Sequence, residues 1–375
     1  MTEHNGTLPK HSNLLYNNAP KPSGNDQQLQ IMASRQLGSW MAEVKTSLAF
    51  TTYQASKLFF VGLKDDGQLS IFERTFARCM GLYAQGDALY TSSLYQIWKF
   101  QNALVGSQTY QSKNIAYDRL FVPQVGYTTG DIDVHDIAED AEGNAIFVSA
   151  LFSCIAKVST THSFTPLWKP PFISKLAAED RCHLNGMATE NGVPRYATAV
   201  SDTDMANSWR DHRSEGGVLI DVSSNEIVLR GLSMPHSPRL YQDKLWLLDS
   251  GRGRFGYVDL KAGRFETVAL CPGYMRGLAF RGKYAIVGLS RPRGDASFTG
   301  LELDTMLAKQ RTEPWCGLAV IDLERGDLVH SLQIKGIVSE LYDVALIPDA
   351  RRPAGLGFQS EEIRRSLSID ESALR

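Results

Sequence analysis

Short runs of β-branched and aromatic residues alternate along the chain with Gly, Asp and Pro. In these runs, alternation or continuous apolar character dominates over helical periodicity, which predicts β-strands. Helical patterns are few, and we expect them at 29–36, at 303–310 and in the charged tail from Glu361. Many short strands at regular spacing are typical of a sandwich, a barrel or a propeller. Representative runs are KLFFVGL, ALYTSS, AIFVSAL, KLWLLDS and CGLAVIDL.

A step made of a small or polar residue followed by apolar residues recurs ahead of each group of strands. It reads RCMGLYA at 78–84, DVHDIAE at 133–139, HLNGMAT at 183–189, PHSPRLY at 235–241, YMRGLAF at 274–280 and ELYDVAL at 340–346. The mean interval between equivalent positions is near the ~40–50 residues of a four-stranded propeller blade. The repeat therefore predicts an all-β, six-bladed β-propeller. Seven blades are the alternative, if residues 47–50 form a further inner strand.

The sixth step leaves too little chain behind it to build a whole blade. We expect the strands between Ser47 and Ile71 to complete that blade. Strands from both ends of the chain would then close the ring and remove the unpaired edges that promote aggregation. The expected organisation is a polar N-terminal arm at 1–39, a single β-propeller domain at 40–350 and a charged C-terminal tail at 351–375.

Composition and charge limit which partners and which cellular compartment we expect for the chain. The 375 residues are 43% hydrophobic and 21% charged, and the formal net charge is −2, so nothing attracts the chain to nucleic acid or to an anionic membrane. No apolar run is long enough to span a bilayer, and the polar N-terminus lacks the apolar core of a signal peptide. Five widely spaced cysteines without a CxxC motif are typical of reduced thiols. We therefore expect a cytoplasmic protein with no nucleic-acid or membrane partner.

Several segments resemble those of a bacterial family of conserved proteins of unknown function. The resemblance runs from about Ser47 to Asp343 and is carried by FTTYQASKLFFVG, CHLNGMA, MPHSPRLYQDKLWLLDSGRG and PGYMRGLAFRGKYAIVGLSRPR. It implies a propeller-like fold. It brings no established reaction with it, so the chemistry has to be argued from the residues.

Side chains just before the six steps should surround one mouth of the central channel. In order they are Met80, His135, Asn185, Ser237, Arg276 and Tyr342, and they are flanked by Arg78, Asp133, His183, His236, Tyr274 and Glu340. Most of these residues are polar, whereas a merely packed channel should be apolar, because a buried polar group without a partner costs roughly 1–3 kcal/mol. The pattern predicts a binding site for a small polar molecule.

Three histidines are the candidate catalytic residues: His135, His183 and His236. Imidazoles exchange protons near neutral pH and can act as general acid and base. They could instead ligate a divalent metal, with Asp133 or Glu340 as a further ligand. A third interpretation is structural, in which the histidines only hydrogen-bond neighbouring blades.

The candidate substrate-binding residues are Arg276, Asn185, Tyr342, Arg78, Trp209 and Arg210. A guanidinium such as Arg276 binds a carboxylate or phosphate in bidentate fashion. An internal ion pair with Asp133, Glu340 or Asp343 is the alternative for it. Trp209 and Arg210 lie in a long polar excursion at 201–217, and Arg291 and Arg293 lie in a second one at 290–317. Such loops could form a lid over a ligand.

The sequence contains no GxSxG elbow and no Walker motif. The glycines at 250–256 lie between two strands and predict a hairpin turn, so we expect neither a nucleotide nor a flavin cofactor. The favoured function is an enzyme that acts on a small polar, anionic metabolite by acid–base chemistry, with or without a metal. It would be a lyase, cyclase, isomerase or hydrolase. The alternative is a non-catalytic propeller that binds a ligand or a protein partner.

Overall fold

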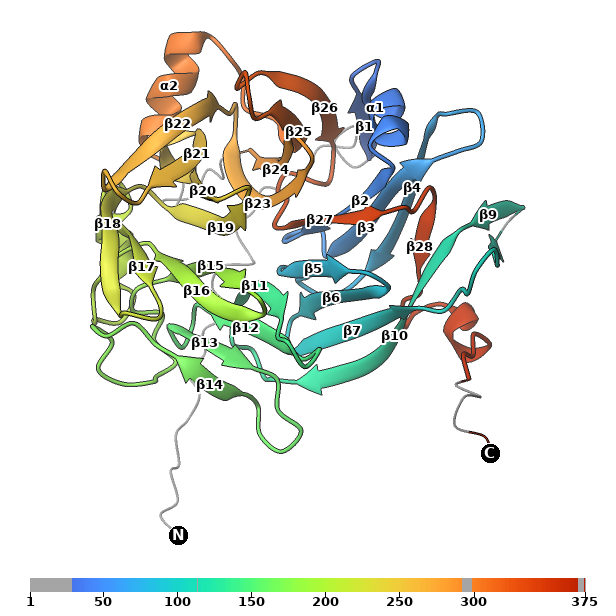
Figure 1. Ribbon diagram of the computed structural model, residues 1–375, viewed down its shortest axis with the longest axis horizontal. Coiled ribbons are helices and arrows are strands. Elements are labelled where there is room, and N and C mark those ends of the chain that lie inside the picture. The colour runs from blue at the N-terminus through green and yellow to red at the C-terminus, as the bar shows by residue number, and fades with distance from the viewer. Residues whose placement is uncertain (1–28, 113, 292–298, 370–373, 375) are drawn as a thin grey trace.

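The computed structural model describes residues 29–112, 114–291, 299–369 and 374 (Figure 1). Within these residues, six sheets of four or five strands surround a central axis, and a separate two-stranded hairpin lies beside them. The innermost strand of each sheet begins within or directly after one of the six sequence steps. The six-bladed propeller is confirmed. Residues 47–50 lie in the second strand of a sheet rather than in an innermost one, so the seven-bladed alternative is wrong.

We number the blades by the order of their inner strands. Blade one holds β5 (Leu82–Gln85), β6 (Ala88–Ser93), β7 (Gln96–Asn102), β10 (Arg119–Thr128) and β28 (Pro353–Gly355). Blade two holds β11 (Val134–Glu139), β12 (Ala145–Ser149), β13 (Cys154–Lys157) and β14 (Thr165–Trp168). Blade three holds β15 (Leu184–Glu190), β16 (Val193–Ala199), β17 (Gly217–Asp221) and β18 (Glu226–Leu232).

Blade four holds β19 (Pro235–Tyr241), β20 (Lys244–Asp249), β21 (Arg254–Asp259) and β22 (Arg264–Leu270). Blade five holds β23 (Tyr274–Arg281), β24 (Tyr284–Ser290), β25 (Cys316–Asp322), β26 (Leu328–Lys335) and β1 (Gln30–Ala33). Blade six holds β27 (Val344–Pro348), β2 (Thr46–Thr52), β3 (Lys57–Leu63) and β4 (Leu69–Thr75). The hairpin is β8 (Tyr110–Ser112) and β9 (Ile115–Tyr117).

Blade six closes the ring with strands from both ends of the chain, as predicted. β2 pairs with β27 in antiparallel register, from Thr46 opposite Pro348 to Phe50 opposite Val344. The sheets also extend past the expected limits of 40–350. β1 pairs with β26 inside the segment expected to be an arm, and β28 pairs in parallel with β10 inside the expected tail. Residues 1–28 lie outside the described residues.

The predicted helix at 29–36 is wrong, because residues 30–33 form β1. Pairing with the edge of β26 supplies backbone hydrogen bonds that outweigh a weak local preference for helix. The helix α1 begins later and spans Leu37–Glu43. The helix α2 spans Glu302–Gln310, as predicted, and the short 3-10 helices are η1 (Ser208–His212), η2 (Ser250–Arg252) and η3 (Glu361–Arg364). No helix in the described ranges is long and apolar enough to cross a membrane.

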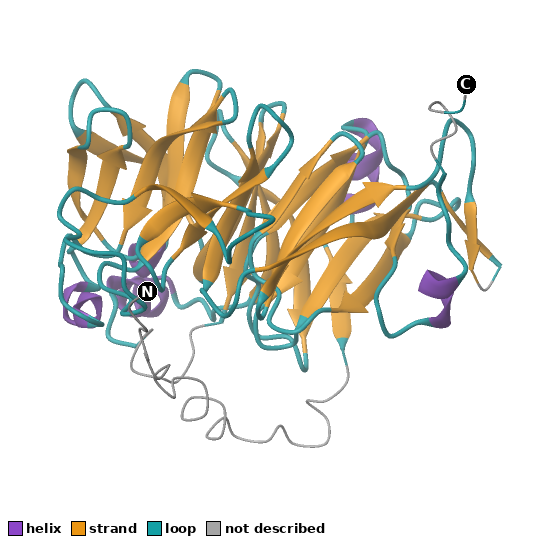
Figure 2. Cartoon of the chain, turned by 90° about the horizontal axis from the view of Figure 1, so that it is seen from below, coloured by secondary structure: helices purple, strands orange, loops and turns teal. Residues whose placement is uncertain are grey.

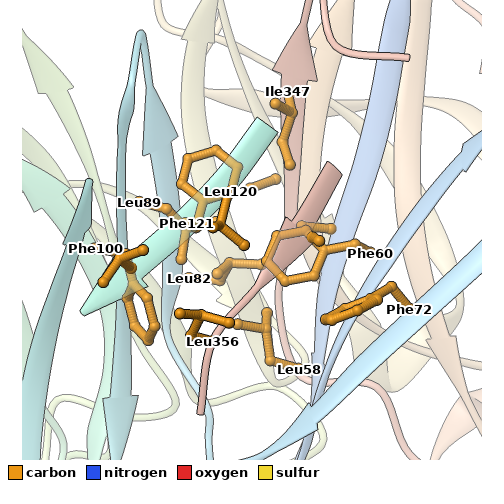
Figure 3. Close-up of a cluster of buried hydrophobic side chains, with 14 of the residues drawn as sticks. Leu58, Phe60, Phe72, Leu82, Leu89, Phe100, Leu120, Phe121, Ile347 and Leu356 are labelled. Carbon is orange, nitrogen blue, oxygen red and sulfur yellow. The ribbon is translucent and has the colours of Figure 1, made fainter. Parts of the chain in front are cut away.

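Apolar side chains fill the space between neighbouring blades. Figure 3 shows one such cluster, which joins blades six and one. Alternation along each strand sends one set of side chains to each face of its sheet, so both faces of a blade are buried against neighbours. Figure 2 shows the result from the side, with loops gathered at the two faces of the ring. The cluster includes Leu58, Phe60, Phe72, Leu82, Leu89, Phe100, Leu120, Phe121, Ile347 and Leu356.

Hydrogen bonds from the six steps tie the inner strands together around the axis. Asp343 accepts a hydrogen bond from the backbone N–H of Leu82 at 2.9 Å, which joins blade six to blade one. Asp136 accepts one from the N–H of Met187 at 3.0 Å, which joins blade two to blade three. The guanidinium of Arg239, from blade four, bonds Asp136 at 2.8 and 3.0 Å. We call Asp136, Arg239 and Asp343 the axial clasp.

Candidate functional site

The chain turns into the channel through strained backbone. Non-glycine residues with φ between 47° and 55° lie just before or within the start of the inner strand in four of the six blades. This left-handed conformation costs about 1–3 kcal/mol per residue and persists where the surrounding structure imposes it, often at functional sites. The strain therefore marks this mouth as the candidate site. The residues are Arg78, Asp133, His183, Met234 and Ser237, the last two both in blade four.

His183 is supported by two partners that its own blade supplies. Its Nδ1 lies 2.9 and 3.1 Å from the two carboxylate oxygens of Asp180. The indole N–H of Trp209 donates to the same carboxylate at 2.7 Å. The Trp209 ring also stacks on the imidazole, with 4.0 Å between ring centroids. Position and tautomer of His183 are thus both determined, since Asp180 accepts the hydrogen on Nδ1 and leaves Nε2 to accept a proton.

The pKa of His183 is lowered from its ordinary value of 6.5. Burial is the largest cause, because it disfavours the charged imidazolium, and the charge of His135 acts in the same direction. The charge of Asp180 and its hydrogen bond to His183 raise this pKa, but by less than burial and His135 lower it. His183 is therefore neutral at pH 7 and competent to accept a proton.

His135 links three blades. Its Nδ1 lies 3.0 Å from Asn185 Oδ1, and the Asn185 amide donates to the carbonyl of Pro235 at 3.1 Å. Its Nε2 lies 3.1 Å from Asp133 Oδ2. Both ring nitrogens are occupied by protein partners, which suits His135 less than His183 for exchanging a proton with a ligand. This is the structural role that the sequence left open as an alternative.

The Asp133 carboxylate stays ionised beside His135. Burial would raise the pKa of Asp133, but the charges of His135 and Arg78 and the hydrogen bond to His135 outweigh burial and hold that pKa below its ordinary range. The rings of His135 and His183 lie edge to face, with 4.8 Å between their centroids. The sequence-predicted convergence of two histidines from neighbouring blades is thus present.

His236 engages the next blade instead. Its Nε2 lies 3.2 Å from the Tyr274 hydroxyl, and the side chain is buried. Burial, followed by the charge of Arg276, lowers the pKa of His236 well below 6.5. His236 is therefore neutral at pH 7 and bridges blades four and five.

Arg276 lies between two aromatic rings and close to a carboxylate. Its guanidinium carbon is 5.1 Å from the ring centroids of both Tyr274 and Tyr342. Its Nη1 lies 3.2 Å from Glu340 Oε2. This is one of the internal ion pairs considered as alternatives to a ligand anion.

Tyr342 presents an unused donor at the site. Its hydroxyl is buried and has no hydrogen-bond partner among the described residues. Burial raises the pKa of Tyr342 well above 10, although Arg276 acts against this, so the phenol keeps its proton. A buried hydroxyl left unpaired costs about 1–3 kcal/mol, which makes it a candidate contact for a ligand. The ring lies 5.5 Å from that of His135.

The remaining sequence candidates have other contacts. Arg78 forms an ion pair with Asp131. Arg210 lies over the Trp209 ring at 4.4 Å and is exposed. Trp209 itself is only 4% exposed, so it forms a wall against His183 rather than an outer surface. Arg293 lies outside the described residues, and a lid formed by the two excursions stays a prediction.

The candidate metal ligands bond other protein groups in this structure. In the part of the chain that the structure describes, no group of three or more His, Cys, Asp or Glu side chains is arranged to hold a metal ion. The proposed ligands instead bond protein groups: His135 bonds Asn185 and Asp133, His183 bonds Asp180, His236 bonds Tyr274, and Glu340 bonds Arg276. The interpretation of His135, His183, His236, Asp133 and Glu340 as a metal centre stays a prediction.

The five cysteines are buried free thiols, as expected. Burial raises the pKa of Cys182, next to His183, to about 12, so this thiol is not a nucleophile at neutral pH.

Asp180 is a site residue that the sequence analysis did not identify. Its only signal was a carboxylate three residues before a candidate histidine, a spacing that is common in loops.

Fold and site together define a six-bladed β-propeller with a polar cluster around one mouth of its channel. The chain belongs to the family described as Domain of unknown function (DUF4915), whose model matches residues 35–356. This confirms the resemblance seen in the sequence. Among curated proteins, none matches the chain.

Several solved structures are similar to this chain at low sequence identity. A chain from the structure of a Nidogen/Laminin complex is 14% identical, with 81% of this chain and 99% of that chain covered and a TM-score of 0.49. A protein of unknown function from Bacteroides caccae is 11% identical, with the same shares covered and a TM-score of 0.48. Virginiamycin B lyase from Staphylococcus aureus is 10% identical, with 82% and 99% covered and a TM-score of 0.37. We draw no functional conclusion from these similarities.

Proposed function

We propose that this protein is an enzyme that transfers protons to and from a small polar, anionic metabolite at the propeller mouth. The reaction would be of the lyase, cyclase, isomerase or hydrolase type. The observation that carries the proposal is the assembly of His183, Asp180 and Trp209. A neutral imidazole held in one tautomer by a half-buried carboxylate is the arrangement that general bases require.

His183 is the proposed base. Its Nε2 takes a proton from the bound molecule, and the carboxylate of Asp180 stabilises the imidazolium that forms. The stacked and hydrogen-bonded Trp209 keeps this pair from rotating. A base oriented in this way contributes about 10²–10⁴-fold to the rate of a reaction.

Tyr342 is the proposed acid. Its phenol keeps a proton at neutral pH, and its hydroxyl has no partner in the described part of the chain. The rings of Tyr342 and His183 both contact the ring of His135, so we propose that one bound molecule meets both the acid and the base. Removal of one proton and delivery of another is the chemistry of eliminations and isomerisations. Arg276, beside Tyr342, would supply positive charge toward an anionic group.

The proposal is tested by incubating the purified protein with a small-molecule extract of bacterial cells and following every mass by mass spectrometry. We expect wild type to convert at least one anionic compound. His183→Asn should lower that conversion by at least about 100-fold, because the base is removed. His162→Asn changes an exposed histidine outside the site and should leave conversion unchanged.

Equal conversion by wild type and His183→Asn would contradict the role of His183. A compound that is retained on the protein during ultrafiltration but never converted would support the alternative, a non-catalytic binding propeller. Retention that is lost in Arg276→Lys would then place the anionic group of that compound on the guanidinium, since lysine lacks the planar fork.

The pH dependence of conversion follows from the lowered pKa of His183. We expect kcat/KM to rise with pH, to reach half of its maximum below pH 6.5 and to be constant near neutrality, because only the neutral imidazole accepts a proton. In Asp180→Asn the carboxylate that favours the imidazolium is lost, so the half-maximum should move to a still lower pH while the maximum falls. A half-maximum above pH 6.5 in wild type would contradict this assignment.

A further inference from the structure

Two excursions from different blades meet in one buried apolar cluster. The segment between β16 and β17 contributes Trp209, and α2, which lies between β24 and β25, contributes Leu303 and Leu307. All three side chains are at most 6% exposed. The cluster is completed by Val200, Met234, Tyr274 and Leu301, with Met306 packed against it. The excursions are thus joined to each other rather than solvated separately.

The helix α2 is itself docked on blade four. Arg252 in η2 donates to Glu302 at 3.0 Å. Gly253 follows with φ 66°, and a Cβ at this position would lie 2.6 Å from the Met306 methyl group and 2.8 Å from Leu303. A larger residue would strain this backbone conformation, and the ends of the Met306 and Leu303 side chains would have to move. The helix α2 therefore contacts η2 of blade four as well as the cluster that contains Trp209.

From Trp209 the contacts continue to the site. The indole N–H bonds Asp180, and its ring stacks on His183. We infer that α2 is a positioning element, which acts through Trp209 to hold the Asp180–His183 pair in its working geometry. The inference rests on the proposed function for its catalytic consequence. Leu303 and Leu307 are its positioning residues, more than 110 residues from His183 in the sequence.

The test compares two leucine truncations. Leu303→Ala removes packing from the cluster that contains Trp209. Leu332→Ala empties an equally buried position on β26 of the same blade, in a different cluster. Each protein is labelled with 5-fluorotryptophan for ¹⁹F NMR, with the Trp209 signal identified by its loss in Trp209→Phe. The downfield proton signal of His183 Nδ1–H, hydrogen-bonded to Asp180, is recorded in the same samples.

We expect Leu303→Ala to shift the Trp209 signal and to weaken the His183 signal, whereas Leu332→Ala changes neither. In an enzyme that shows conversion, kcat should fall about tenfold in Leu303→Ala with KM within twofold of wild type, because a misplaced base affects the chemical step. If Leu303→Ala does not fold, Met306→Ala, half-buried in the same cluster, replaces it.

Unchanged Trp209 and His183 signals in Leu303→Ala would overturn the inference, and so would shifted signals with an unchanged kcat. If wild type converts no compound in the extract, the proposed function fails on its own. The two NMR signals then still decide whether α2 positions the Asp180–His183 pair.

Discussion

A chain that begins at Gln54 is expected not to fold, whereas a chain that begins at Ser34 should keep the whole ring. Starting at Gln54 removes β2, which among the described strands is the sole partner of β27 and is the inner neighbour of β3 in blade six. It also removes the fully buried Leu48 and Phe50, each worth about 1.5–3 kcal/mol of burial. Losses of this size, with two hydrogen-bonded ladders, approach the ~5–15 kcal/mol of a whole protein. Thermal melting followed by circular dichroism measures the effect.

The matched control is the chain that begins at Ser34. Of the described elements it lacks only β1, an edge strand whose residues are half-buried or exposed. It should therefore melt cooperatively and within a few degrees of the full chain. A start at Trp40 should do worse, because α1 buries Leu37 against blades five and six. Cooperative melting of the chain from Gln54 at the temperature of the full chain would contradict the closure of the ring by β2.

The inner strands were predictable because each begins within a short motif that the chain repeats. The residues of the motif recur for a physical reason. At Gly277, for example, φ is 76° and a Cβ would lie 2.6 Å from the backbone nitrogen of Val344 in the next blade. The outer additions β1 and β28 carry no such signal, because each joins a blade whose other strands lie far away in the sequence. Only the folded sheets show that their edges are open to a further strand.

The sequence predicted where the site lies better than it predicted which partner each site residue contacts. Blade order alone brings His135 and His183 to the same mouth. Blade order could not show that both ring nitrogens of His135 lie within hydrogen-bond distance of protein groups. Nor could it show that Asp180 and Trp209 contact His183. These assignments depend on contacts between a strand and a loop, where spacing in the sequence does not fix which side chains meet.

The axial clasp was also missed, although its three residues lie within or beside the repeated steps. Arg239 bonds both oxygens of Asp136 and lies 4.0 Å from Asp343. Both carboxylates are 3% exposed. The guanidinium of Arg239 thus forms ion pairs with two buried carboxylates. Burial and the neighbouring Asp136 raise the pKa of Asp343 to about 7, although Arg239 opposes them. The folded chain therefore holds a proton at Asp343 that the unfolded chain releases near its ordinary pKa of 3.8.

The sign of the pH effect follows from the raised pKa. The stability contributed by protonated Asp343 is fully present below about pH 4 and is lost as pH rises through about 7. Arg239→Met should strengthen this dependence, because the charge of Arg239 opposes the rise in the pKa of Asp343 and its loss raises that pKa further. We expect the loss relative to wild type to be larger at pH 8 than at pH 5.5.

Arg239→Met should lower the free energy of unfolding by about 3–5 kcal/mol at pH 8, the usual cost of removing one partner from a buried ion pair. Urea unfolding of variant and wild type at both pH values measures the loss, and comparison at equal pH cancels the titration of groups common to both chains. Arg230→Met is the control, because Arg230 and Asp202 form an exposed pair. Exposed pairs contribute about 0–1 kcal/mol, with little change between the two pH values. A loss for Arg239→Met that equals the control, or that is larger at pH 5.5 than at pH 8, would show that the clasp does not hold the blades together through its charges.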